Sequence, residues 1–214
     1  MKTQYLNIEH PGALEEAIRL LLSDEVIAFP TETVYGLGVR YSDRGLKTLC
    51  TIKKRDPAKP IAICLASYED IKNIIKEVPD LFWVLARHFL PGPLTIVFPS
   101  EKGSVGVRIP EHDLCQKLLK KTGPLYVTSA NYSKYGDIIH PLEVYQNFEG
   151  IIAGVLADNN KLKYNKCSTV VQIENSTSIK LLREGPILWK TIQASLHLIP
   201  VSYTHLTLPT SDLV

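Results

Sequence analysis

The sequence predicts one α/β domain with a mixed sheet. Short apolar runs of strand character alternate along the chain with segments whose apolar residues recur at the spacing of an α-helix. The 214 residues, 45% hydrophobic and 21% charged, fit a single domain of ordinary size. No repeat, low-complexity run or linker interrupts the alternation, so we expect one folding unit.

Helices dominate the first half of the chain. The first is predicted by an apolar stripe at helical spacing, made by Leu14, Ala17, Ile18, Leu21 and Leu22. The run VIAF that follows predicts a short buried strand ending at Pro30. Ser67 and Asp70 form a sequence pattern typical of a helix N-terminus. The predicted helices span 11–25, 42–54, 67–78 and 80–90.

Strands dominate the second half. A helix at 113–121 is closed by Gly123, and a short helix starts at Pro141. Segments 168–173 and 178–182 flank a polar turn and predict an antiparallel hairpin. The other predicted strands span 94–98, 104–110, 124–128 and 151–157.

Charge and cysteine content argue against several classes of protein. The net charge of +2 offers no global polycation for nucleic acid, so any basic surface must be local. The 4 cysteines form no CxxC pair, which is typical of reduced cytosolic thiols rather than of disulfides or a zinc site. Neither a secretory leader nor an apolar run long enough to span a membrane is present. We therefore expect a cytoplasmic protein without a membrane segment.

The C-terminal residues call for separate treatment. The stretch VSYTHLTLPT, residues 201–210, matches the translation of a transposon adapter used in common sequencing libraries. We therefore expect the folded domain to cover residues 1–198 and residues 199–214 to be a disordered, non-native tail. A genuine disordered tail is the alternative.

Polar side chains cluster within or just after four predicted strands. In open α/β sheets, ligands bind in a crevice at strand ends. Ser, Thr and Asn are also common turn and cap residues, and that interpretation is favoured for any one cluster alone. Four clusters together favour a ligand site. They are 31–33, Arg108, 128–131 and 167–169.

Lys53 and Arg108 are the most informative cations. Lys53 lies on the apolar face of its predicted helix, and Arg55 and Lys59 follow it in KKRDPAKP, a cationic segment of the kind that binds phosphates. A solvated helix end is the alternative, and the segment alone does not decide between them. Arg108 alternates with apolar residues along its strand and is a candidate to hold a carboxylate. His112 has no second metal ligand at suitable spacing and is expected to cap locally.

Seven blocks of the chain resemble, in order, those of the threonylcarbamoyl-AMP synthase family, the YrdC/YciO-like proteins. The blocks are FPTETVYGLG, KKRDPAKPIAI, PGPLTIVF, VGVRIPEH, TSANYS, CSTVVQI and LLREGPI. They cover about residues 8–187 and resemble the short, single-domain form. The resemblance implies a YrdC-like twisted open mixed sheet with flanking helices and a concave ligand cleft. It also implies synthesis of threonylcarbamoyl-AMP and pyrophosphate from L-threonine, bicarbonate and ATP with Mg²⁺, for threonylcarbamoyladenosine modification of tRNA.

The resemblance also implies roles for single residues. Lys53 and Arg55 would be catalytic because they neutralise the triphosphate as pyrophosphate leaves. L-Threonine would be bound by Thr31, Thr33, Cys64, Arg108 and Ser168. ATP would be bound by Lys53, Arg55, Lys59, Ser129, Asn131, Asp137 and Arg183.

Three positions depart from the family pattern and keep alternatives open. Cys64 stands where many relatives have histidine, Gln172 where aspartate is common, and Asp137 where a phosphate-facing serine is often found. One alternative is a YrdC/YciO-like paralogue acting on another substrate. Another alternative is a module that binds double-stranded RNA or tRNA. For the synthase, the resemblance implies a tRNA threonylcarbamoyl transferase complex as a partner. The RNA-binding rim would comprise Lys53, Lys54, Arg55, Lys59, Lys117, Lys120 and Lys121.

Overall fold

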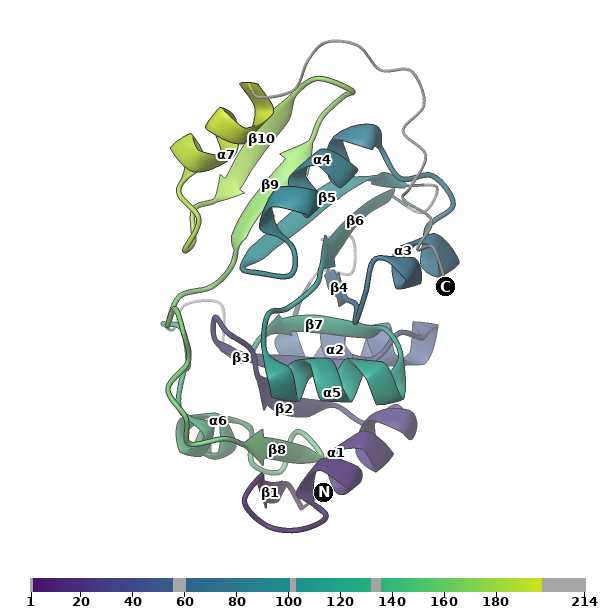
Figure 1. The fold of residues 1–214 in the computed structure, drawn as a ribbon. Helices are drawn as coiled ribbons and strands as arrows, with labels where there is room; N and C mark the ends of the chain where they lie inside the picture. The colour runs from purple at the N-terminus through teal and green to yellow at the C-terminus, as the bar shows by residue number, and fades with distance from the viewer. Residues whose placement is uncertain (1, 56–60, 101–102, 132–135, 198–214) are drawn as a thin grey trace, which may run out of the picture.

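The computed structural model describes residues 2–55, 61–100, 103–131 and 136–197. Two sequence predictions lie outside these residues, namely the tail at 199–214 and the ATP-binding role of Lys59. Within the described ranges, strands and helices alternate as the sequence predicts (Figure 1).

The strands form one mixed sheet, ordered β1-β8-β2-β3-β7-β4-β6-β5-β9-β10. The pairs β1/β8, β2/β8, β4/β6 and β5/β9 are parallel, and the remaining neighbours are antiparallel. The strands are β1 Gln4–Asn7, β2 Ile27–Pro30, β3 Tyr35–Arg40, β4 Ala62–Cys64, β5 Leu94–Ser100, β6 Gly103–Arg108, β7 Leu125–Ser129, β8 Gly154–Ala157, β9 Thr169–Ile173 and β10 Ile179–Arg183.

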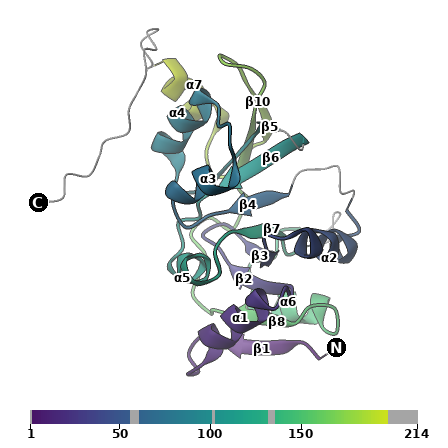
Figure 2. The same ribbon diagram turned by 90° about the vertical axis from the view of Figure 1, so that its right-hand side faces the viewer.

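Helices cover both faces of the strands β8, β2, β3 and β7. On one face α1 and α5 enclose a core around Phe29, Leu118 and Leu125, and on the other α2 and α6 enclose a core around Leu37, Leu49 and Phe148. Figures 1 and 2 show α5 and α2 on opposite sides of β7. The helices are α1 Ala13–Leu22, α2 Asp43–Lys53, α3 Glu69–Ile74, α4 Asp80–Phe89, α5 Asp113–Thr122, α6 Pro141–Phe148 and α7 Trp189–His197.

The strands β6, β5 and β9 bury one face against α3, α4 and α7. Val107 and Ile109 belong to that core and are 0% and 1% exposed. Because side chains alternate along a strand, Arg108 between them points to the opposite face. Cys64 is its neighbour in the parallel pair β4/β6 and lies on that same face. The strand pattern thus places a cation inside the fold on a face that α3, α4 and α7 do not cover.

The predicted helices and strands are found in the structure, whereas the helix α7 and three strands were not predicted. The hairpin β9/β10 is antiparallel, and α5 ends at Gly123, whose φ of 75° suits glycine. The Ser67 N–H donates to Asp70 at 3.0 Å, which is one half of the predicted capping box, but the helix N-cap is Tyr68 and α3 already ends at Ile74. The missed strands are β1, β3 and β4.

Two predictions about composition are also settled within the described residues. All of Cys50, Cys64, Cys115 and Cys167 are free thiols. In the described ranges, no helix combines the length and the apolar character that crossing a bilayer requires.

Candidate functional site

The loop between β2 and β3 is organised by its two threonine hydroxyls. Thr31 Oγ1 donates to the Val34 carbonyl at 2.7 Å and accepts from the Thr33 and Val34 N–H groups at 3.2 and 3.3 Å. The two hydroxyl oxygens are 2.8 Å apart. Since the Thr31 proton is committed to Val34, the Thr33 hydroxyl must donate to Thr31. This turn leaves Thr33 Oγ1 free to accept from another element.

Arg108 supplies that donor and forms a buried ion pair. Its Nη2 donates to Thr33 Oγ1 at 2.9 Å and to Glu32 Oε1 at 2.8 Å. Arg108 is 8% exposed and Glu32 1% exposed. Burial alone would lower the pKa of Arg108, but Glu32 and the nearby thiols outweigh it and the net shift is upward. Among the described residues, Arg108 Nε and Glu32 Oε2 have no hydrogen-bond partner.

Cys64 lies beside this ion pair as a neutral thiol. It is buried, and it is the register partner of Arg108 in β4/β6. Burial is the main cause that raises the pKa of Cys64 to about 12, partly opposed by the Arg108 charge. The thiol is therefore protonated at neutral pH, so it offers a compact polar surface and no charge.

Ser168 joins β5, β9 and β10. Its hydroxyl lies 2.9 Å from Thr95 Oγ1, and Arg183 donates from Nε to the Ser168 carbonyl at 3.0 Å and from Nη2 to the Ser168 hydroxyl at 3.3 Å. The backbone passes so close at Gly185 that a Cβ there would lie 2.3 Å from the Cys167 carbonyl oxygen. Ser168 and Arg183 are therefore held as one unit.

Lys53 reaches from the last turn of α2 to the end of β7. Its Nζ donates to the Ser129 carbonyl at 2.8 Å and also to the Asn131 carbonyl. Lys53 is 7% exposed. Burial, followed by the Arg55 charge, lowers the pKa of Lys53 to about 8. Ser129 Oγ donates to Asn131 Oδ1 at 2.7 Å, which fixes the loop that Lys53 holds.

Asp137 closes the same loop onto the start of β9. Its Oδ2 accepts from the Cys167 N–H and its Oδ1 from the Cys167 thiol, both at 2.8 Å. Burial first, and this thiol hydrogen bond next, raise the pKa of Cys167 to about 11. Asp137 is thus engaged with protein donors at the position where a phosphate contact was predicted.

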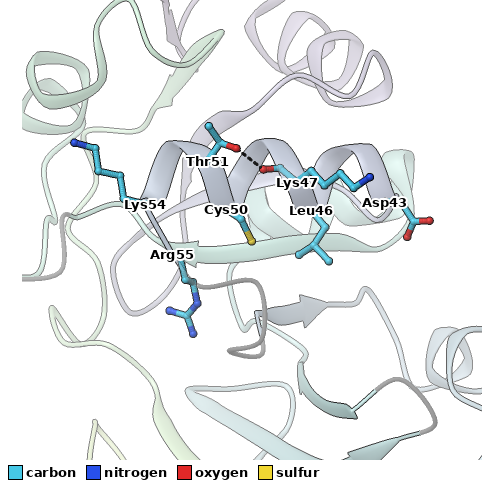
Figure 3. Close-up of a pocket in the computed structure, with 7 residues that line it drawn as sticks. All are labelled: Asp43, Leu46, Lys47, Cys50, Thr51, Lys54 and Arg55. Atoms are coloured by element: carbon cyan, nitrogen blue, oxygen red, sulfur yellow. Dashed lines mark hydrogen bonds between the residues drawn. The ribbon is translucent and has the colours of Figure 1, made fainter.

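A groove runs along α2 toward Arg55 (Figure 3). Its volume is about 690 Å³. Leu46, Cys50 and Arg55 project to one side of the helix in Figure 3, whereas Lys54 projects away from them. The lining residues are Asp43, Leu46, Lys47, Cys50, Thr51, Lys54 and Arg55.

The structure corrects the predicted RNA-binding rim. Its α2 members and its α5 members were expected to form one surface. The two helices pack in different cores on opposite sides of β7, so Lys117, Lys120 and Lys121 are separated from Lys53 and Arg55 by the sheet (Figures 1 and 2). The described cations of α2 and those of α5 therefore lie on opposite faces of the sheet and not on one rim.

The described part of the predicted site is brought together around the ends of β2, β6, β7 and β9. Glu32 and Thr95 are members that the proposed ligand sets left out. The sequence does contain a signal for Thr95, because its hydroxyl is the polar group among the apolar residues of the strand LTIVF. His112 caps α5 through the Cys115 N–H at 3.5 Å, as predicted. No group of three or more metal-binding side chains occurs in the described ranges.

Comparison with known proteins identifies the family. A model of the Sua5/YciO/YrdC domain, described as telomere recombination, matches residues 19–185. The chain belongs to this family. Among Sua5/YciO/YrdC relatives, the human threonylcarbamoyl-AMP synthase is 31% identical over 91% of this chain and 76% of the human protein. The threonylcarbamoyl-AMP synthase of Pyrococcus abyssi is 33% identical over 75% of this chain.

A solved structure of the family agrees with the fold. The crystal structure of P. abyssi Sua5 complexed with L-threonine matches 91% of this chain and 61% of that chain, with a TM-score of 0.82 at 27% identity. The chain spans 50% of the length of the P. abyssi synthase that it matches in sequence. The common region is thus the Sua5/YciO/YrdC domain that the family model describes.

Proposed function

We propose that this chain is an L-threonylcarbamoyladenylate synthase, a nucleotidyltransferase that makes threonylcarbamoyl-AMP and pyrophosphate from L-threonine, bicarbonate and ATP. The observation that carries the proposal is the division of one site into two parts. Arg108 is neutralised by a buried carboxylate, whereas Lys53 is held by backbone carbonyls. The first part suits a small polar molecule, and the second suits a polyanion.

The Arg108 part is assigned to L-threonine. The buried pair of Arg108 and Glu32 offers a positive and a negative charge, and the Thr33 hydroxyl lies beside it. L-Threonine carries a carboxylate, an ammonium group and a hydroxyl, which these groups complement. Thr31 and Ser168 fix the two sides of this pocket, and Cys64 limits its size. The complex of the related P. abyssi Sua5 with L-threonine supports this assignment.

The Lys53 part is assigned to ATP. Lys53, Arg55 and Arg183 would neutralise the triphosphate, and Ser129 and Asn131 would bind polar groups next to it. Lys59 is a further predicted contact and lies outside the described residues. ATP would enter as its magnesium complex. The magnesium would supply charge neutralisation at the phosphates, with phosphate oxygens and water among its ligands.

The chemistry would proceed in two steps. The neutral amine of L-threonine attacks the carbon of bicarbonate, a C–N bond forms, water leaves and the product is a carbamate. A carbamate oxygen then attacks the α-phosphorus of ATP, and the bond to the β-phosphate breaks with release of pyrophosphate. Lys53 and Arg55 stabilise the negative charge that develops on the leaving group. The adenylate would serve threonylcarbamoyladenosine modification of tRNA through a separate transferase complex.

The test is turnover by the full chain with ATP, Mg²⁺, bicarbonate and L-threonine. Pyrophosphate release and the adenylate, detected by mass spectrometry, are followed with each component omitted in turn. Release that depends on both threonine and bicarbonate is the expected result. Release that depends on another amino acid in place of threonine would identify the paralogue that Cys64 and Asp137 keep open. ATP binding without any turnover would overturn the proposal.

A further inference from the structure

Two loops on the Lys53 side are joined through Asp137 and Cys167. The carboxylate uses both oxygens, one for the Cys167 N–H and one for the thiol, each at 2.8 Å. Asp137 follows β7 in the chain, and Cys167 immediately precedes Ser168 and β9. The contact therefore ties the end of one strand to the start of another that is not its neighbour in the sheet.

The Cys167 thiol is buried near the two cations of the Lys53 side. It is 8% exposed, and the Arg183 charge acts to lower its pKa. Lys53 donates a hydrogen bond to the carbonyl of Asn131, and the Asn131 side-chain amide donates to the carbonyl of Gly136, next to Asp137, at 3.4 Å. Arg183 is bonded to the carbonyl of Ser168, the residue after Cys167. A shift of one loop relative to the other would therefore change the separation of the two cations.

We propose that Asp137 and Cys167 are positioning residues that fix the separation of Lys53 and Arg183 for ATP. This inference rests on the proposed function for the identity of the ligand. Cys167 acts as a hydrogen-bond donor and not as a nucleophile, since burial and Asp137 keep its proton in place. Asp137 is one of the positions at which the sequence analysis finds a departure from the family pattern.

Substitutions at Cys167 separate this role from general packing. Cys167→Ala removes the thiol donor but keeps the backbone donor, and a hydrogen bond to a charged group is commonly strong enough for about a tenfold rise in KM for ATP. Because the Arg108 pair is untouched, KM for threonine should stay within about twofold. Cys167→Ser keeps a hydroxyl donor to Asp137 and should restore most of the affinity for ATP.

Substitution of Asp137 completes a double-mutant cycle with Cys167. Asp137→Asn keeps one acceptor for the backbone N–H, but its amide nitrogen cannot accept the thiol proton. It should therefore raise KM for ATP by about the same factor as Cys167→Ala, and the double variant should lose little more. Asp158→Asn is the matched control, because it removes, from the segment between β8 and β9, a carboxylate whose one hydrogen bond within the described ranges comes from the Asn160 backbone N–H.

The experiment measures KM for ATP and for threonine in the full chain and its variants, together with amide hydrogen exchange of the peptides that contain Asp137 and Cys167. Faster exchange in Cys167→Ala, rescue in Cys167→Ser and an increase confined to KM for ATP are expected. If Cys167→Ala and Asp137→Asn leave KM for ATP within twofold, or raise both KM values equally, the positioning role is wrong. If the unchanged chain releases no pyrophosphate, the proposed function fails by itself, and unchanged exchange in Cys167→Ala would still refute the contact's role.

Discussion

The two sides of the site bury their cations in different ways. Arg108 is paired with Glu32 and hydrogen-bonded to Thr33, so its charge is already balanced inside the protein. Lys53 is equally buried, but it donates hydrogen bonds to two neutral backbone carbonyls, and among the described residues it forms no salt bridge. Burial consequently lowers the pKa of Lys53, whereas the pKa of Arg108 shifts upward.

The difference teaches which ligand charge each side can accept. A balanced ion pair gains little from a further net charge and suits a molecule whose own charges cancel. A buried ammonium held by carbonyls remains unbalanced, so an anion that approaches it relieves the cost of its desolvation. Each side can be altered without touching the other, and the effects should therefore separate.

The largest expected effect comes from removing the buried ion pair of Arg108 and Glu32, which makes up the balanced side of the site. Glu32→Ala leaves the Arg108 guanidinium buried without its carboxylate, which should lower the free energy of unfolding by about 3–5 kcal/mol. Urea denaturation measures this change. Glu111→Ala is the control, because its ion pair with Lys163 is exposed, with side chains 52% and 55% accessible, and should be worth about 0–1 kcal/mol. Equal losses in the two variants would contradict the contrast between the sides.

Removing Lys53, the cation of the unbalanced side, should reduce turnover rather than the stability of the fold. Lys53→Ala deletes a charge placed for the leaving phosphates, and loss of one such donor commonly reduces kcat by about 100- to 1000-fold. The fold should persist, because only the carbonyls of Ser129 and Asn131 lose a hydrogen-bond donor. Pyrophosphate release and circular dichroism measure the two quantities. The control is Lys54→Ala, which removes the same charge from an exposed neighbour that projects away from Arg55, and near-normal rates for Lys53→Ala would refute the assignment.

The balanced side shows how far the sequence alone reaches. Periodicity and strand alternation place Arg108 on the face opposite Val107 and Ile109, and the structure confirms this placement. Its pairing with Glu32 joins residues 76 positions apart, and local patterns carry no information about such a contact. The strand β3 was missed because YGLGVR contains two glycines, which weaken strand propensity.

The unbalanced side was also predicted only in part. The face of Lys53 follows from helix periodicity, but its partners are carbonyls of Ser129 and Asn131, and every residue carries a carbonyl. The predicted phosphate contact of Asp137 rests on resemblance and stays a prediction. The structure adds that this carboxylate accepts hydrogen bonds from the Cys167 N–H and thiol, a contact that motif matching does not reveal.

A smaller effect should arise where the two sides meet. In Gly185→Ala, the added Cβ would lie 2.3 Å from the Cys167 carbonyl oxygen and 2.4 Å from the Thr169 nitrogen, so the backbone must shift. Overpacking of this kind costs about 1–3 kcal/mol. It should weaken the binding of both substrates, because the shifted backbone belongs to Ser168, which is assigned to threonine and whose carbonyl anchors Arg183, which is assigned to ATP. Gly136→Ala is the control, since its Cβ meets nothing within 4 Å. A loss confined to one substrate would show that the two sides are not joined at this point.

The smallest expected effect is a shift in pH dependence. The ammonium form of Lys53 binds phosphate, and its pKa is lowered to about 8, so kcat/KM for ATP should fall by about tenfold per pH unit above that value. The Arg55 charge contributes to the lowering, and Arg55→Gln should therefore move the alkaline limb upward even though the rate itself declines. Lys53→Arg should abolish the limb, because a guanidinium keeps its proton throughout the accessible range. Initial rates at subsaturating ATP between pH 6.5 and 10 measure the alkaline limb in the unchanged chain and in both variants. If the limb persists unchanged in Lys53→Arg, another group causes it. The titration of Lys53 would then no longer distinguish the two sides of the site.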